Sequence, residues 1–209
     1  MYINADTLET FDSVMQIRQR FPNTCFPSDL SDDILASFNI FYVTKTTPVY
    51  DHILEDPHEL PPALIDGVWT QQWEAVPKYS TQEEIDQALA AHLAQHKQMK
   101  NDEINEARLA ANNGTFMHLG HEISCDALSR IDIEATNGII ILNNAMPPNW
   151  VGFWKTANNQ YIPINTVEEW KAFYTSMFNQ GAINFVHAQQ LKAQLAAATT
   201  HDEVVAIHW

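Results

Sequence analysis

The sequence over residues 80–114 is STQEEIDQALAAHLAQHKQMKNDEINEARLAANNG, and it separates an N-terminal from a C-terminal part of the chain. Ser80 and Glu83 have the spacing of a capping box, which marks the start of a helix. Apolar residues follow three or four positions apart near both ends of the stretch, and Asn113-Gly114 is typical of a helix end. The pattern predicts one helix over residues 81–112, which at 1.5 Å per residue would be about 48 Å long.

The middle of this predicted helix is polar, with the run Gln95-His96-Lys97-Gln98 between the two apolar ends. A helix of this kind suits a connector between two domains, because its middle has nothing apolar to bury. Heptads do not persist for three or four repeats, which argues against a coiled coil. We therefore predict an N-terminal α+β domain over residues 1–80, a connecting helix over 81–112 and a C-terminal helical domain with hairpins over 113–209.

The N-terminal part mixes short helices and strands. The spacing of apolar residues predicts a helix around residues 11–18 and a second over 32–38, with Ser31 as its cap. Residues 40–43 are strand formers, and the proline-rich stretch 48–62 is expected to be an extended surface loop. Asp66-Gly67 between two apolar runs is a strong signal for a β-hairpin.

The second strand of this hairpin places Trp69, Gln71 and Trp73 on one face, because side chains alternate along a strand. Two tryptophans on one face bury a large area. One interpretation is that they cover the small N-terminal core. The other is that they form an aromatic patch for a protein partner.

The C-terminal part predicts two more hairpins and two helices. The first hairpin spans residues 116–123 with Gly120-His121 at the turn, and a helix follows near residues 125–143. A second hairpin is expected over 151–164, and Asn165 or Thr166 then caps a long helix in which Gly181 either breaks the helix or admits another backbone. The fold class is therefore α+β: a small mixed N-terminal domain with a β-hairpin, a long connecting helix, and a C-terminal helical domain with two β-hairpins.

The chain is strongly acidic. Its 11 Lys and Arg residues face 26 Asp and Glu residues, which gives a formal charge of −15 and disfavours nucleic acid and anionic membranes as partners. No apolar run is long enough to span a membrane, and the two cysteines are expected to be reduced thiols. Residues 51–86 hold nine acids and a single base, Lys78, which indicates either a solvated face or a docking surface for a basic segment.

Catalytic and metal-binding patterns are weak. His118, His121 and Cys125 lie close together and with Asp126 offer zinc ligands, but no second Cys/His pair stands at a familiar spacing. Asp126 and Ser129-Arg130 are most simply explained as capping and pairing along one helix. The chain also lacks a phosphate-binding glycine loop and a nucleophile elbow. We therefore expect no enzyme, no catalytic residue, no cofactor and no resident metal.

Three short motifs stand in the N-terminal part: FPNTCFP (21–27), PVYD (48–51) and DGVWTQQW (66–73). They resemble motifs of the tail fibre assembly proteins of tailed bacteriophages, although Cys25 stands where the family favours serine. The C-terminal half is similar to an uncharacterised domain that recurs at the end of such proteins. That likeness lies in Ile104-Asn105 with Arg108, the hairpin 116–121, Asp126 with Ser129-Arg130, WKTANN (154–159) and ATT (198–200).

The resemblance implies a protein-binding phage tail factor, with a chaperone for tail fibre assembly as the leading function. The rival is a structural component of the virion tail, either a fibre component or a baseplate adaptor. The expected partner is a tail fibre or another tail protein, and a homo-oligomer is compatible with the sequence. The expected location is the host cytoplasm during assembly, or the virion tail. The expected partner-binding residues are Tyr50, Asp51, Trp69, Gln71 and Trp73. A cell-wall hydrolase lacks the paired carboxylates or metal ligands it would need.

Overall fold

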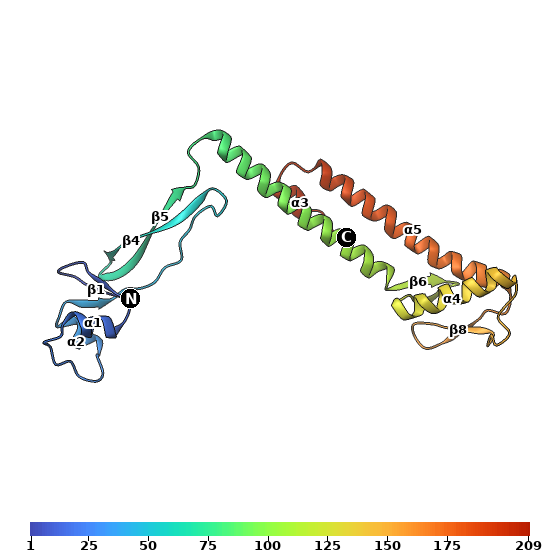
Figure 1. The fold of residues 1–209 in the computed structure, drawn as a ribbon, viewed down its shortest axis with the longest axis horizontal. Helices are drawn as coiled ribbons and strands as arrows, with labels where there is room; N and C mark the ends of the chain where they lie inside the picture. Colours follow the sequence, from blue (N-terminus) through green and yellow to red (C-terminus); the bar gives the residue numbers. More distant parts are fainter. The chain divides into compact units, whose positions relative to one another are not determined.

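The computed structural model describes all residues from Met1 to Trp209, and these divide into two compact units, Met1–Ala90 and Ala91–Trp209. Each unit has its own buried core. The structure has six helices, several small antiparallel sheets and the long helix α3 (Gln82–Asn112), so the predicted α+β class is confirmed (Figure 1). The division into domains 1–80, 81–112 and 113–209 stays a prediction.

The first part of the N-terminal unit is a three-stranded sheet covered by two short helices. Its elements are β1 (Tyr2–Asn4), β2 (Thr10–Phe11), α1 (Val14–Arg20), α2 (Asp32–Ala36) and β3 (Ile40–Tyr42). The strands are antiparallel in the order β2-β1-β3. The core beneath them consists of Phe11, Ile17, Leu35 and Ile40. Ser13 caps α1 with its side chain, whereas Ser31 precedes α2 without a side-chain capping bond.

A long hairpin completes this unit. Strands β4 (Glu55–Ile65) and β5 (Val68–Pro77) pair antiparallel around Asp66-Gly67. Asp66 and Gly67 have φ of 49° and 80°, the left-handed conformation that a type I′ turn requires. The predicted hairpin is therefore confirmed.

The prediction of a loop through Pro62 was wrong for its second half, because β4 runs through Pro57, Pro61 and Pro62. A proline cannot donate a ladder hydrogen bond, but a strand with one unpaired edge tolerates it. β4 is such a strand, since β5 is its sole sheet neighbour. The register shifts between Leu60 and Ala63, where Pro61-Pro62 interrupts the ladder.

The cap of helix α3 lies one residue later than predicted. The reciprocal bonds join Thr81 and Glu84: the Glu84 N–H donates to Thr81 Oγ1 at 3.3 Å, and the Thr81 N–H donates to Glu84 Oε2 at 3.0 Å. The capping box is thus Thr81–Glu84, and the predicted Ser80–Glu83 pair was wrong. The N–H groups of Ser80 and Thr81 hold the pKa of the Glu84 carboxyl below its usual range.

The C-terminal unit contains the rest of α3, two hairpins and three further helices. Its elements after α3 are β6 (Thr115–His118), β7 (His121–Ser124), α4 (Ala127–Asn143), β8 (Phe153–Lys155), β9 (Tyr161–Pro163), α5 (Val167–Ala197) and α6 (His201–Val205). Both predicted hairpins are present. The first turns at Leu119-Gly120, with φ of 50° and 80°, and not at Gly120-His121. Thr166 and Glu169 form the capping box of α5.

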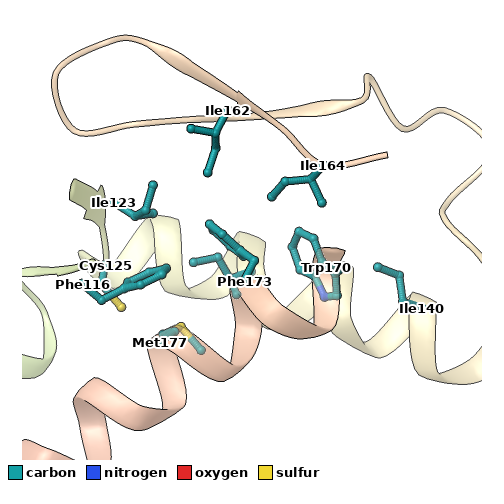
Figure 2. Packing of buried hydrophobic residues seen from close by; sticks show 10 residues of the cluster. Phe116, Ile123, Cys125, Ile140, Ile162, Ile164, Trp170, Phe173 and Met177 are labelled. Carbon is teal, nitrogen blue, oxygen red and sulfur yellow. The ribbon is translucent and has the colours of Figure 1, made fainter. Parts of the chain in front are cut away.

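Two clusters form the core of this unit. In the first, Trp170 and Phe173 on α5 point toward Ile162 and Ile164, with Ile140 of α4 beside them (Figure 2). The second cluster lies between α5 and the Ala91–Asn112 part of α3, which run antiparallel. Hydrogen bonds join the two helices from Asn184 to Asn112, from Lys192 to Asn105 and from Lys97 to Ala196. The buried members of this cluster are Ile104, Ala188, Leu191, Leu195, Ala198, Val204 and Ile207.

Gly181 neither breaks α5 nor admits a neighbouring backbone, so both sequence interpretations were wrong. The helix continues through it, and a Cβ built at this position would meet no atom within 4 Å. The glycine instead faces open space beside a pocket. The structure has no helix that is long and apolar enough to cross a membrane.

Candidate functional site: a pocket with two arginines

A pocket of the C-terminal unit lies where the end of α3, the first turns of α4 and the middle of α5 meet. Its volume is about 390 Å³. Its lining combines charged, aromatic and aliphatic side chains: Arg108, Asn112, Arg130, Glu134, Tyr174, Met177, Phe178, Gly181, Ala182 and Phe185. A concave site with a few polar groups on an apolar wall is the usual form of a ligand site.

Two guanidinium groups dominate the pocket. Arg108 lies near the end of α3, with its Cζ 4.8 Å from the centre of the Phe185 ring. Arg130 lies one turn after Asp126, the residue whose side chain caps α4. The Nε atoms of both arginines are buried and have no hydrogen-bond partner. A buried donor without a partner costs about 1–3 kcal/mol, so this arrangement calls for an explanation.

Neither arginine forms an ion pair within the protein. Glu134 stands one turn after Arg130, but its Oε2 accepts a hydrogen bond from the Tyr174 hydroxyl at 2.9 Å. The four ion pairs of the chain involve other residues. The predicted pairing of Arg130 with Asp126 is absent, because Asp126 accepts its bonds from Leu128 and Ser129.

The acid–base state of the pocket favours binding over proton transfer. Burial raises the pKa of the Tyr174 phenol, and the hydrogen bond to Glu134 raises it further. Tyr174 therefore stays protonated at neutral pH and holds Glu134 in place. The phenol O–H is already donated to Glu134, which leaves the two guanidiniums as the donors that suit an anion.

The residues expected from the sequence to bind a partner lie in the N-terminal unit. Trp69, Gln71 and Trp73 come together along β5, where residues 44–46 run beside the strand. The Gln71 N–H donates to Thr44 O at 2.9 Å, and Trp73 Nε1 donates to Thr46 O at 3.2 Å. Both tryptophans are half-buried and stand outside the core cluster of this unit.

Trp73→Ala is expected to lower the free energy of unfolding by about 1–3 kcal/mol, because the indole loses both its packing and its hydrogen bond to Thr46. Trp73→Phe keeps most of the apolar area and should cost about 1 kcal/mol. Chemical denaturation followed by circular dichroism measures both. Unchanged stability in Trp73→Ala would leave partner binding as the role of this side chain.

Tyr50 and Asp51 lie at the other end of the hairpin from its turn. Asp51 Oδ1 accepts from the Ile53 N–H at 2.9 Å, and the Asp51 carbonyl accepts from Leu54 and Glu55. Asp51 therefore shapes the turn that leads into β4. The structure brings Trp69, Gln71 and Trp73 together but does not add Tyr50 and Asp51 to them.

The residues weighed as zinc ligands do not form a metal site, although His118 and His121 face each other across the β6–β7 hairpin. His118 is buried against the Phe173 ring and lies 2.9 Å from Ser176 Oγ through Nδ1. Burial lowers the pKa of His118, and His121 lowers it further. Cys125 belongs to the apolar core, and Asp126 caps α4. No group of three or more His, Cys, Asp or Glu side chains is arranged to hold a metal ion.

Sequence reasoning missed two features. His201 joins His96 and His92 of α3, with ring nitrogens 2.8 Å and 3.0 Å apart, although these residues are distant in sequence. The arginine pocket was missed as well. The sequence marked its arginines only singly: Arg108 and Arg130 stand in separate motifs of the C-terminal resemblance and are two of only 11 basic residues.

Comparison with known proteins gives a family but no activity. No curated protein and no solved structure matches the chain. One family model matches residues 95–208, more than half of the 209 residues, and its span includes the arginine pocket and both core clusters of the C-terminal unit. The chain therefore belongs to the family described as a domain of unknown function (DUF4376).

Proposed function

We propose that this protein binds other proteins during assembly of a tailed bacteriophage and acts as a chaperone for the tail fibre. The phage context comes from the motifs in both halves, among them DGVWTQQW at residues 66–73 and WKTANN at 154–159. Immature chains of an intertwined fibre expose apolar edges, and a binder that covers them prevents aggregation.

The observation that carries protein binding is an exposed apolar stripe on α4. Leu128, Ile131, Ala135, Ile139 and Leu142 are all exposed and follow one another at spacings of three or four, which places them on one face of the helix. The opposite face holds Ile133 and Ile140, which are buried in the core. Large aliphatic side chains gathered on a solvent-facing helix are typical of a surface that a partner covers.

The acidic hairpin of the N-terminal unit supports a second, electrostatic contribution. Asp56, Glu59, Asp66 and Glu74 are exposed along β4, β5 and their turn. Such a surface speeds the encounter with a basic segment, and salt weakens the effect within a Debye length of about 8–10 Å.

Production of the fibre polypeptide with and without this protein tests the proposal. We expect aggregated or unassembled fibre chains alone and a severalfold higher yield of soluble trimers in the presence of the protein. Size-exclusion chromatography with light scattering measures that yield. Equal trimer yield in both conditions would end the chaperone proposal.

The alternative is a structural component of the tail, as a fibre component or baseplate adaptor. The same apolar stripe would then be covered permanently in the virion. Mass spectrometry of purified virions separates the two roles, because a structural component is present at fixed stoichiometry and a chaperone is absent.

A further inference from the structure

We propose that the pocket between α3, α4 and α5 binds a carboxylate of a partner polypeptide that stands next to an apolar side chain. The inference rests on the proposed function in one respect, namely that the ligand is a polypeptide. The choice of a carboxylate comes from the pocket itself.

The need for an anion follows from the two arginines. Arg108 and Arg130 line one pocket, and neither side chain has an ion pair or a hydrogen bond within the protein. The Nε atom of each is buried without a hydrogen-bond partner, while each side chain as a whole is half-buried and lines the pocket. A guanidinium without an ion pair is stabilised by an anionic acceptor, and its planar group matches a carboxylate with two parallel bonds.

A single carboxylate fits better than a polyanion. The pocket holds about 390 Å³, which accommodates one or two residues of a peptide. The chain as a whole carries a formal charge of −15, so a nucleic-acid backbone would be repelled around the pocket. Glu134 forms no ion pair with either arginine, and its own negative charge in the pocket adds to the repulsion of a polyanion.

The apolar neighbour follows from the other walls. Met177, Phe178 and Phe185 line the pocket, and both phenylalanines are exposed at its rim. Gly181 leaves the middle of α5 without a side chain at this point. A glycine inside a helix costs about 1 kcal/mol relative to alanine, and here the space it leaves adds to the pocket.

Binding is tested on the full-length protein with three acetylated tetrapeptides and isothermal titration calorimetry. The first ends in leucine with a free C-terminal carboxyl, the second is its C-terminal amide, and the third is an amide with an internal glutamate before leucine. Inorganic phosphate is the fourth probe. We expect binding of the first or the third peptide, which tells a chain terminus from a side-chain carboxylate, and no binding of the uncharged amide.

Pocket variants locate the binding. Arg130→Met and Arg108→Met each remove one charged donor group and should weaken peptide binding about 10- to 100-fold. Gly181→Leu fills the pocket while both arginines stay in place. Leucine also has a higher helix propensity than glycine, so this variant tests the pocket even if an arginine variant does not fold. Lys171→Met, an exposed charge on α5, is the matched control for the arginines. Gly138→Leu is the control for Gly181→Leu, because Gly138 also lies inside a helix with no atom within 4 Å of an added Cβ.

Three results overturn the inference: no binding of either carboxylate peptide, equal binding of the uncharged amide, or binding by phosphate as tight as by the peptides. Unchanged peptide affinity in Arg130→Met and Gly181→Leu also overturns it, because the peptide then binds elsewhere. The fibre assay separates this failure from that of the proposed function. If wild-type protein does not raise the trimer yield but the pocket variants lose peptide binding, the chaperone proposal fails and the pocket inference stands.

Discussion

Trp170→Ala is expected to lower the free energy of unfolding by about 3–5 kcal/mol, the usual cost of truncating a buried tryptophan. Trp170 is 0% exposed at the centre of the first core cluster. Its ring lies 5.5 Å from that of Trp150, 5.7 Å from that of Trp154 and 5.4 Å from that of Phe173. The substitution leaves a cavity and also removes the donor that bonds Asn137 Oδ1 at 3.3 Å.

Denaturant unfolding followed by far-ultraviolet circular dichroism measures this loss without relying on tryptophan fluorescence. Trp209→Ala is the matched control, since Trp209 is 43% exposed at the chain end and should cost about 1 kcal/mol or less. A loss below about 1 kcal/mol in Trp170→Ala would contradict the packing of β8 and β9 on α5.

The sequence predicted those elements whose signals are local. Asp66-Gly67 predicted the long hairpin because both positions adopt positive φ. Asn165 or Thr166, with a glutamate three residues later, predicted the start of α5, and the structure has Thr166 with Glu169. The helix predicted over residues 81–112 differs from α3 by one residue at its start. In each case a few neighbouring residues determine the backbone.

Features that depend on tertiary structure were mispredicted or missed. Strand β4 was assigned to a loop from its prolines, because its pairing with β5 and its open edge are not visible in the proline pattern. The arginine pocket needs Arg108, Arg130 and Tyr174 from three helices, and no spacing rule joins them. Its second signal, the absence of a counterion, exists only in the folded chain.

The apolar stripe of α4 is tested by an aspartate substitution at its exposed face. Ile131→Asp is expected to weaken binding to the fibre polypeptide by about 2 kcal/mol or more, which is more than tenfold in Kd. Ile131 is 63% exposed, so the substitution removes no core contact, and its effect on stability should be small. In a covered interface the new carboxylate would be buried without a partner, which adds a desolvation cost to the lost apolar contact.

Ile141→Asp is the matched control, because Ile141 is 71% exposed on the same helix and, at 3.6 residues per turn, points away from the stripe. Surface plasmon resonance with the co-produced fibre polypeptide compares the two variants with the parent chain, and thermal unfolding checks that all three are folded. A selective loss in Ile131→Asp ties binding to the stripe, since both variants carry the same charge change. Equal losses would assign the effect to added negative charge on an already acidic chain, and unchanged Kd in both would remove α4 from the binding surface. If the stripe instead joins two copies of this chain, Ile131→Asp would convert a dimer to a monomer in the absence of any fibre.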